Sequence, residues 1–492
     1  MTYDGFSFWW CAEFWLYYSF YYRDSLKKIV ENLNSPNKEK LSFKERIRPW
    51  GIKQFLKTHA IARKLYWSFL HKEEFVAHQE RQGQKVLAVC SYNWQNGDPY
   101  LKPMLEHLKN YNIVLADATQ REYRGFSILK EKAKQTQRHI LLEQYVGYLD
   151  ILSISKKARH IQEQVRNLEE TVEFKESWKI DGINIWELIK PQFDCYFKYR
   201  LEGHILDYEC AKALLQHEKP NLVIYPCEGG DLAYIFFKLC QDKKIPCVGI
   251  QHGTMSYSPL TVHLPEEQVP QPTKLLVYGK YYADFLMKHG AYPIEKIEVT
   301  GNLRYDDYAG RYDKSVYKPK PILLYVGNIL PSQQEYEEMT RAVFQVAKDL
   351  NMNLIVKQHP AETSEKIYDK FAKEIGITPI IVTKTASNYE MLSMSDVVIG
   401  AESTLNYEAM ILNKPIINMS LGHEFSLPFV HDGAVIGIKD IGDIKIAVQK
   451  CLFDDYTRAC LKQKMAKLVS EHCYIIDGKS AERSAEIIRG LL

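Results

Sequence analysis

Two short polar motifs in the first half of the chain combine a carboxylate with an imidazole. Glu228 lies in the sequence CEGGD and His252 in the sequence QHGT, and each motif directly follows an apolar segment. A carboxylate and a histidine on adjacent loops of one sheet edge can deprotonate a hydroxyl group. We therefore predict Glu228 and His252 as catalytic residues, with His252 as the base because its ordinary pKa is near neutrality. The structural alternative is a glutamate that caps a helix beside a packed histidine. Asp98 and Asp231 are further candidates for the base, on the side where the hydroxyl-bearing acceptor would bind.

The second half of the chain carries groups that could bind phosphate. Ser403 and Thr404 lie where an apolar segment meets the start of a helix, so backbone N–H groups there are available to an anion. The alternative role is an ordinary helix cap. His359 and Pro360 follow another apolar segment, which ends at Lys357. A histidine and a lysine at a strand end can both donate hydrogen bonds to phosphate oxygens.

Three other positions lie near these candidate phosphate-binding residues. Gly327 and Asn328 form a tight turn directly after an apolar segment, and Glu408 lies one turn into the helix that follows Thr404. Glu408 could bind the hydroxyl groups of a ribose, or it could be solvated. We predict that all three residues contact a bound nucleotide.

Several enzyme classes have characteristic motifs that this sequence lacks. It contains no GxGxxG, Walker A, HExxH or GxSxG motif and no zinc-ligand spacing. Its ten cysteines are scattered without a CxxC pair, which predicts buried free thiols. Dinucleotide oxidoreductases, P-loop enzymes and serine hydrolases are therefore disfavoured, and no metal site is predicted.

Strands and helices alternate in two series, which would position these motifs at strand ends. The first series has predicted strands at 86–89, 112–116, 221–225, 246–250, 274–278 and 297–300, and the second at 321–326, 353–357, 379–382, 396–399 and 415–418. Between strands of the first series, the stretch 126–215 is predicted to be largely helical. Such alternation favours parallel, doubly wound sheets, which bind ligands at the carboxyl ends of their strands.

Length and charge limit the remaining possibilities. The chain has 492 residues, and at roughly 100–200 residues per domain this indicates about two to four domains. The net charge of +3 excludes a nucleic-acid-binding character for the whole chain. The two strand–helix series place an α/β domain at 86–305 and a second at 315–475, between an N-terminal extension at 1–85 and a C-terminal segment at 476–492.

The N-terminal extension is aromatic and then basic. Twelve of the first 22 residues are aromatic, but the uncharged run 14–22 is too short for a membrane span, which needs about 20 residues. The segment 44–70 is expected to form an amphipathic helix that contacts an anionic membrane surface, although an ordinary docked helix has the same pattern. Its basic residues alternate with bulky aromatic ones and are Lys44, Arg46, Arg48, Lys53, Lys57, Arg63 and Lys64.

The combination of motifs resembles the GT-B glycosyltransferases that build surface carbohydrates. The resemblance extends to capsule Kdo transferases, polysialyltransferases and CDP-glycerol glycerophosphotransferases. His359-Pro360 and Ser403-Thr404 look like the motifs with which those enzymes bind the donor nucleotide. His252-Gly253-Thr254 is similar to the His-Gly-Thr loop of the glycerophosphotransferases. Cys227-Glu228-Gly229 is similar to an acidic-acidic-glycine motif, except that Cys227 occupies the first acidic position.

The resemblance covers residues 86–485 and implies two Rossmann-like α/β domains facing a cleft, an acceptor domain at 86–305 and a nucleotide-donor domain at 315–475. It also implies that the C-terminal helix at 476–492 packs back toward the first domain. It implies metal-independent transfer of a sugar from a nucleotide donor, with cytidine favoured, to a hydroxyl of a surface glycan or lipid-linked acceptor. The nucleotide-activated sugar is then a substrate, and no cofactor and no nucleic-acid partner is implied. The expected location is cytoplasmic, with peripheral contact to the inner face of the membrane.

Two rival interpretations stay open within the same fold. Val299–Asn302 and the stretch from Glu408 to Pro415 also resemble the UDP-N-acetylglucosamine 2-epimerases. The long helical stretch 126–215 and the N-terminal extension fit those enzymes poorly. The other rival is a non-catalytic glycan-assembly protein that has kept the fold.

Overall fold

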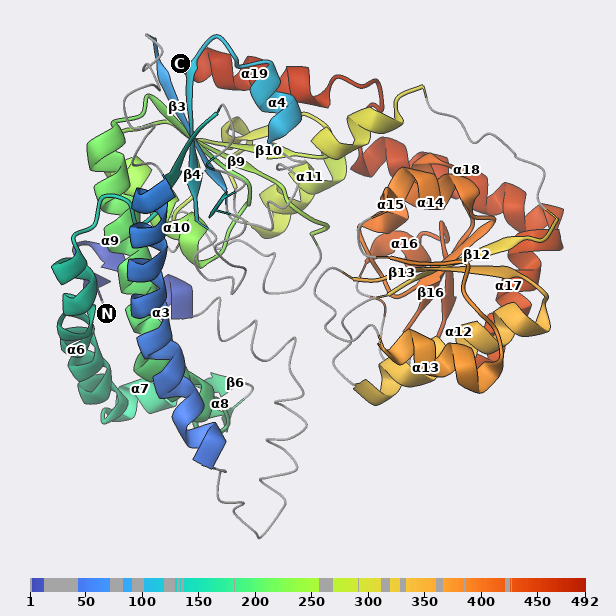
Figure 1. Cartoon of the computed structure of the whole chain (residues 1–492), viewed down its shortest axis with the longest axis horizontal. Coiled ribbons are helices and arrows are strands. Elements are labelled where there is room, and N and C mark those ends of the chain that lie inside the picture. The colour runs from blue at the N-terminus through green and yellow to red at the C-terminus, as the bar shows by residue number, and fades with distance from the viewer. Residues whose placement is uncertain are drawn as a thin grey trace.

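The computed structural model of the chain contains two α/β lobes, each built on a parallel sheet (Figure 1). In the helix 43–70, side chains are described from residue 57 onward. The structure describes residues 2–12, 43–70, 83–90, 101–118, 129–130, 133, 137–180, 182–255, 269–290, 292–310, 319–327, 333–359, 366–383, 386–420, 425 and 427–492.

The first lobe contains a seven-stranded sheet in which every pair of neighbours is parallel. Its order is β11-β10-β9-β8-β3-β4-β5, with β3 Lys85–Cys90, β4 Asn112–Asp117, β5 Arg138–Leu141, β8 Leu222–Tyr225, β9 Cys247–Ile250, β10 Lys274–Val277 and β11 Ile297–Val299. The predicted strands of this series are confirmed to within one or two residues. Most of the described residues of the stretch 126–215 are helical, as predicted, but the stretch also contains β5 and two short strands at 179–180 and 183–184.

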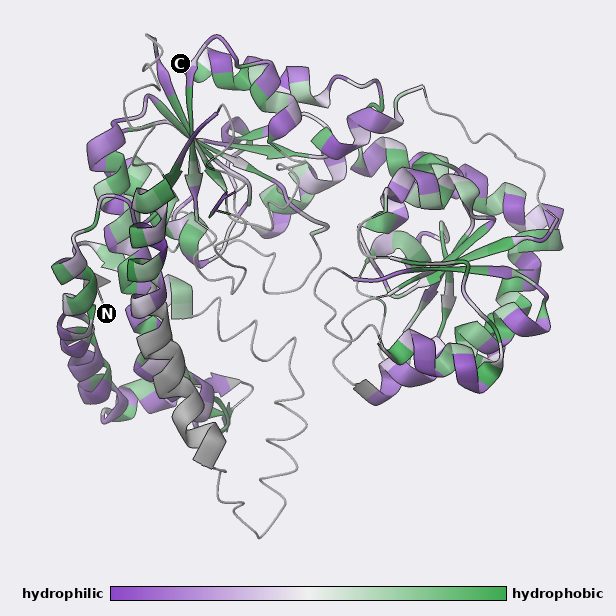
Figure 2. Ribbon diagram, viewed as in Figure 1, coloured by the Kyte–Doolittle hydropathy of each residue, from purple (hydrophilic) through white to green (hydrophobic). Residues whose placement is uncertain are grey.

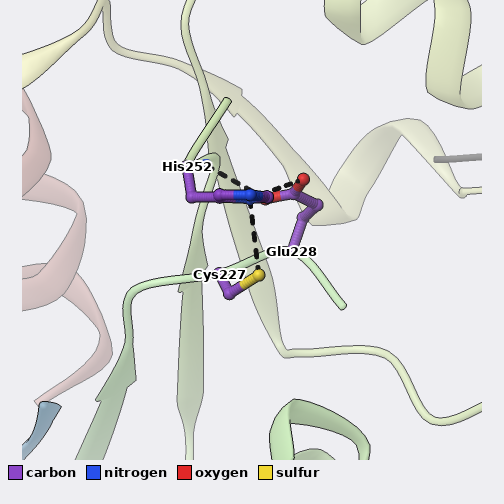
Figure 3. Close-up of side chains that lie close together, drawn as sticks. All are labelled: Cys227, Glu228 and His252. Atoms are coloured by element: carbon purple, nitrogen blue, oxygen red, sulfur yellow. Dashed lines mark hydrogen bonds and ion pairs between the residues drawn. The ribbon is translucent and has the colours of Figure 1, made fainter. Parts of the chain in front are cut away.

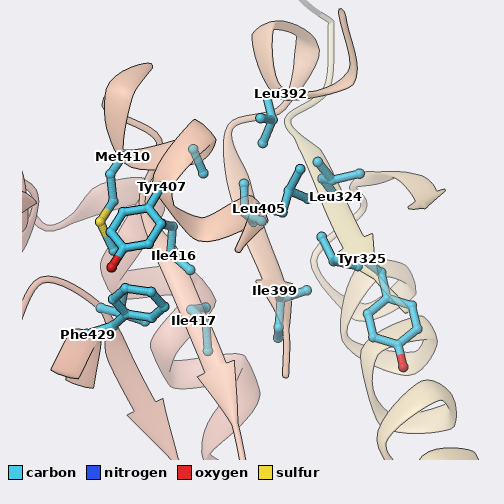
Figure 4. Packing of buried hydrophobic residues seen from close by; sticks show 14 of the residues in the cluster. Leu324, Tyr325, Leu392, Ile399, Leu405, Tyr407, Met410, Ile416, Ile417 and Phe429 are labelled. Carbon is cyan, nitrogen blue, oxygen red and sulfur yellow. The ribbon is translucent and has the colours of Figure 1, made fainter. Parts of the chain in front are cut away.

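The second lobe contains a six-stranded parallel sheet of order β14-β13-β12-β15-β16-β17. The strands are β12 Ile322–Val326, β13 Asn353–Lys357, β14 Ile381–Thr383, β15 Val397–Gly400, β16 Ile416–Met419 and β17 Ile436–Ile438. The central strands are apolar throughout because helices cover both faces (Figure 2). Figure 4 shows this core, where Tyr407 and Phe429 pack beside Ile416 and Ile417.

Helices connect the strands in both lobes. Those of the first lobe are α4 Lys102–Glu106, α6 Tyr148–Glu169, α7 Val172–Glu176, α8 Trp186–Cys195, a π-helical turn Tyr196–Arg200, α9 Leu201–Glu218, α10 Asp231–Lys243 and α11 Lys280–His289. A 3₁₀ segment, Leu303–Tyr308, precedes the second lobe. The helices of the second lobe are α12 Gln333–Asp349, α13 Lys366–Ile375, α14 Asn388–Met394, α15 Leu405–Ile411, α16 Pro428–His431, α17 Ile444–Phe453 and α18 Asp455–His472. Short pairs of strands form at β1 Thr2–Tyr3 with β2 Phe6–Ser7, and at β6 Lys179–Ile180 with β7 Ile183–Asn184.

The C-terminal helix α19 (Ser480–Leu491) returns to the first lobe, as expected (Figure 1). Its apolar face, which includes Ala485 and Ile488, packs in one cluster with Met104 of α4 and with strand residues of the first sheet. At the start of the helix, the carboxylate of Asp306 accepts hydrogen bonds from the backbone N–H groups of Ser480 (2.9 Å) and Ala481 (2.8 Å). A carboxylate at a helix N-terminus satisfies donors that have no partner within the helix.

The N-terminal extension packs on the first lobe. Phe6 and Phe8 are fully buried beside Tyr208 of α9. In α3 (Phe43–Leu70), Lys57 pairs with Glu202 at 2.9 Å and Arg63 with Glu143 at 2.9 Å, and all four side chains are buried. Lys57 and Arg63 are therefore not available to a membrane surface, which corrects the expectation for these two residues. Within the described parts of the chain, no helix has both the length and the apolar character needed to cross a bilayer.

Candidate functional site

Glu228 and His252 meet at the carboxyl ends of the neighbouring strands β8 and β9 (Figure 3). Nδ1 of His252 lies 2.8 Å from Oε2 and 3.0 Å from Oε1 of Glu228. The backbone N–H of His252 donates to Oε2 at 3.0 Å. The side chain of Glu228 is 5% exposed, whereas that of His252 is 46% exposed. A buried carboxylate thus holds a half-exposed imidazole in one orientation.

This contact determines which nitrogen of His252 can act as a base. An ionised carboxylate only accepts hydrogen bonds, so Nδ1 carries the hydrogen that is shared with Glu228. In the neutral ring, Nε2 on the opposite side then holds the lone pair, which is the tautomer that a general base requires. Partial loss of water around the ring lowers the pKa of His252, but Cys227 and Glu228 outweigh this effect and raise its pKa well above the ordinary value. The imidazole of His252 therefore becomes neutral, and able to accept a proton, only at a pH above the ordinary pKa of histidine.

Cys227 is the third polar side chain of this site, and its only signal in the sequence is the imperfect match to the acidic-acidic-glycine motif. Its Sγ lies 3.4 Å from Nδ1 of His252 and 3.0 Å from the carbonyl oxygen of Gly229. Cys227, Glu228 and His252 offer three metal-ligating atoms within 4.8 Å of one another. Two ligands of one tetrahedral zinc ion lie about 3.3 Å apart. The 2.8 Å contact between Nδ1 and Oε2 is shorter, so the pair fits a hydrogen bond better than a shared ion.

Asp231 lies at the start of α10, directly after the loop that carries Glu228. The chain enters the helix through Gly230, whose φ of +104° favours glycine. Oδ2 of Asp231 contacts Nε2 of His204 at 2.8 Å, and Nδ1 of His204 lies 2.7 Å from the hydroxyl of Tyr196. The predicted acceptor-side carboxylate is thus held by a buried histidine of α9. His204 lies inside a long helix without a motif, so no local sequence signal identified it.

The predicted donor residues gather at the carboxyl ends of three adjacent strands of the second sheet. Val326 of β12 is in register with Lys357 of β13 and with Gly400 of β15. The N–H of Gly327 donates to the carbonyl oxygen of Lys357 at 2.8 Å, and half-buried His359 lies two residues further along. A Cβ atom at Gly400 would lie 2.6 Å from the carbonyl oxygen of Val326, so only glycine fits there.

Ser403 and Thr404 precede α15, as predicted. Oγ of Ser403 accepts a hydrogen bond from the N–H of Leu405 at 3.3 Å, while the side chain of Thr404 makes no capping hydrogen bond. Nζ of Lys357 donates to the carbonyl oxygen of Ala386 at 3.2 Å. Burial lowers the pKa of Lys357, and the nearby Glu408 partly opposes this effect.

Glu408 is buried and hydrogen-bonded, so the alternative that it is solvated is wrong. Its Oε2 accepts from the hydroxyl of Tyr308 at 2.5 Å and from Nδ2 of Asn388 at 3.0 Å. Tyr308 belongs to the 3₁₀ segment that precedes the second lobe. The donor-side helix α15 is therefore connected to the segment between the lobes through this carboxylate.

Three predicted site residues, Asp98, Asn328 and Pro360, lie outside the described residues. The other predicted residues fall into two groups, one at the strand ends of each sheet. His252, Glu228 and Asp231 lie in the first lobe. The donor-side group consists of Gly327, Lys357, His359, Ser403, Thr404 and Glu408.

No family model and no curated protein sequence matches the chain. Solved structures do match. The S. aureus MnaA–UDP structure aligns at a TM-score of 0.51 and 14% identity, over 83% of this chain and 98% of that one. UDP-GlcNAc 2-epimerase from Neisseria meningitidis, bound to UDP-GlcNAc, aligns at a TM-score of 0.51 and 12% identity, over 83% of this chain and 100% of that one. CalG4, the calicheamicin glycosyltransferase, aligns at a TM-score of 0.50 and 13% identity, over 84% of this chain and 98% of that one. With its two parallel-sheet lobes and these neighbours, the chain has the GT-B fold.

Proposed function

We propose that the protein is a glycosyltransferase that moves a sugar from a nucleotide donor to a hydroxyl group of a glycan or lipid-linked acceptor. The observation that carries the proposal is the contact between His252 and Glu228 at the carboxyl ends of β8 and β9. This pair is oriented as a general base. Cationic and hydrogen-bonding side chains gather at the equivalent edge of the second sheet, as a phosphate-containing donor requires.

The reaction follows from the orientation of His252. Nε2 takes the proton of the acceptor hydroxyl while the acceptor oxygen bonds to the anomeric carbon of the sugar. The bond between that carbon and the phosphate oxygen breaks, and the nucleotide leaves with the electron pair. Glu228 stabilises the imidazolium that forms, because its carboxylate is already bonded to Nδ1.

The donor phosphate is proposed to bind in the second lobe. Lys357 and His359 supply positive charge or hydrogen-bond donors there, and Ser403 with Thr404 supplies hydroxyl groups before α15. Protein groups would thus neutralise the leaving phosphate, and transfer should persist in a chelator. Cytidine is the favoured base on the motif resemblance.

Calorimetry with CMP, CDP, UDP and GDP tests the donor proposal. We expect a cytidine nucleotide to bind best and Ser403→Ala to weaken binding by roughly ten- to a hundredfold, since a charge-assisted hydrogen bond contributes about 1.5–3 kcal/mol. Binding of none of the four nucleotides would contradict the proposal and favour a non-catalytic glycan-assembly protein.

A second candidate, a UDP-N-acetylglucosamine 2-epimerase, is favoured by the structural neighbours, since the S. aureus and Neisseria meningitidis structures contain UDP and UDP-GlcNAc. The two candidates differ in their need for an acceptor. The protein is incubated with UDP-N-acetylglucosamine alone, and the configuration at C2 is followed by NMR. Inversion at C2 together with a preference for UDP would replace the transferase proposal.

We also propose a cytoplasmic location with peripheral contact to the inner face of the membrane, because lipid-linked acceptors are held there. Fractionation of cells that express the full chain tests this. The protein is expected in the membrane fraction at low salt and in the supernatant after a high-salt wash. Recovery of all the protein in the supernatant at low salt would contradict it.

A further inference from the structure

The outer surface of the helix pair α3–α6 exposes an unusual group of large apolar side chains. Leu65 and Phe69 of α3 are 54% and 68% exposed. Leu149 and Leu152 of α6 are 81% and 57% exposed, and Tyr148 is 38% exposed. We call these five residues the α3–α6 patch.

Contacts between the two helices show that the patch is one surface. Nζ of Lys64 lies 4.7 Å from the ring centroid of Tyr148, and Lys57 contacts Ser155, which is about two turns further along α6. The helices therefore run antiparallel, with the end of α3 beside the start of α6. On α3, Ala60, Arg63 and Trp67 face the lobe, so Leu65 and Phe69 point away from it.

The same geometry holds on α6. Ile151, Ile154 and Ala158 are fully buried against the lobe, which turns Leu149 and Leu152 outward. The four aliphatic and aromatic side chains of the two helices thus share the outer face, with Lys64 and Tyr148 between them.

Positive charge accompanies the patch. Lys156 and Arg159 are exposed on α6, one and two turns beyond Leu152. Asp150 opposes them with one negative charge. Exposed leucine and aromatic side chains bordered by lysine and arginine are suited to the boundary between lipid headgroups and acyl chains. A tyrosine ring such as that of Tyr148 is favourable at the same depth.

We propose that the α3–α6 patch docks the protein on an anionic lipid bilayer. This deepens the proposed peripheral location and does not depend on the transfer reaction. The proposed membrane-contacting surface also differs from the one predicted from the sequence. Of the basic residues predicted to contact the membrane, Lys57 and Arg63 point into the protein, while the leucines of α6 lie outside the segment 44–70.

Vesicle sedimentation tests the proposal with the full chain. Vesicles of phosphatidylcholine alone are compared with vesicles that also contain phosphatidylglycerol, at low and high salt. The patch variant is Leu149→Glu with Leu152→Glu. The matched control is Val172→Glu with Ile183→Glu, because both residues are apolar, 69% exposed and in the same lobe on α7 and β7. Thermal unfolding shows that each variant is folded, and calorimetry with CMP, CDP, UDP and GDP is measured in parallel.

We expect the wild type to sediment with the anionic vesicles and to dissociate at high salt. The patch variant should bind them at least about tenfold more weakly, since two inserted leucines are replaced by charges, and the control should bind as the wild type does. A wild type that stays in the supernatant, or a patch variant that sediments like it, would overturn the proposal. So would a wild-type dimer in light scattering that the patch variant converts to a monomer, because a second copy would then cover the patch. Nucleotide binding without vesicle binding would overturn the docking alone and leave the proposed function standing.

Discussion

The bond between Glu228 and Nδ1 of His252 makes the opposite ring nitrogen the proposed base, so His252→Ala should lower turnover. The expected loss in kcat is about 10²–10⁴. Nucleotide affinity should stay unchanged, because the donor is proposed to bind in the other lobe. Steady-state kinetics with saturating acceptor and calorimetry measure the two effects.

The matched control for that substitution is His160→Ala, since His160 is exposed on α6 in the same lobe. It should retain wild-type turnover. If His252→Ala also retains full turnover, the base lies elsewhere, and Asp98 and Asp231 become the candidates to replace.

The pKa of His252 provides a second prediction at the residue scale. Partial loss of water around the ring lowers this pKa, and the stronger influence of Cys227 and Glu228 raises it above the ordinary value of 6.5. Because the base acts in its neutral form, kcat/KM should rise with pH through an apparent pKa above 6.5. Glu228→Gln removes the negative charge, so the rising limb of the pH–rate profile should move to lower pH while the maximum rate falls. A rising limb at the same pH in both proteins would show that this pair does not control the rate.

At the level of secondary structure elements, the close contact between β12 and β15 positions the loop that leads to Ser403. In Gly400→Ala the new methyl group would meet the carbonyl oxygen of Val326 at 2.6 Å, so the two strand ends must separate. We expect a loss of roughly 1–3 kcal/mol in the free energy of unfolding and weaker nucleotide binding. Thermal unfolding and calorimetry would measure both changes.

Gly490→Ala is the matched control, because nothing lies within 4 Å of a Cβ atom at Gly490 in α19. That substitution should keep nucleotide binding and stabilise the helix slightly, since alanine is a better helix former than glycine. A Gly400→Ala variant with wild-type stability would contradict the close approach of the strands.

At the scale of the whole molecule, a buried polar contact joins the two lobes. The hydroxyl of Tyr282 in α11 lies 2.5 Å from that of Tyr407 in α15, and the latter lies 2.6 Å from Nδ1 of His472 at the end of α18. The ring of Tyr281 stacks on His472 with centroids 3.8 Å apart. The donor-side helix α15 is thus bonded to the first lobe through Tyr407, and to the 3₁₀ segment between the lobes through Glu408 and Tyr308.

Burial of His472 predicts an acid-sensitive junction between the lobes. Burial lowers its pKa to about 4, so the unfolded chain binds this proton more readily than the folded one between pH 6.5 and 4. Stability is therefore full above about pH 6.5 and falls by up to about 3 kcal/mol as the pH drops toward 4. The midpoint of thermal unfolding should fall over this range in the wild type and fall less in His472→Phe. Equal falls in the two proteins would rule out His472 as the source, and His160→Phe, with an exposed histidine, should behave as the wild type does.

Local sequence patterns determined most of the architecture. Strands such as β8 and β12 are continuous apolar segments because parallel strands are buried on both faces, and this pattern is visible without any partner. Each such apolar segment stops at polar residues, which are Glu228 after β8, His252 after β9 and Lys357 at the end of β13. By contrast, β5 begins with Arg138 and His139 in a charged, helix-like stretch, and only its pairing with β4 makes it a strand.

Only the tertiary structure decided which side chains meet. The contact of Nδ1 with Glu228 joins residues 24 apart in the sequence, and that of Tyr308 with Glu408 joins residues 100 apart. Likewise, the burial of Arg63 depends on its ion pair with Glu143, which is 80 residues away in the sequence. Arg63 was predicted to face a membrane because its partner cannot be seen from the local sequence. A local pattern reports whether a side chain prefers water or the core. It does not report which group, distant in the chain, will lie opposite a charge and set its pKa and its chemistry, because that depends on how the sheets and helices pack.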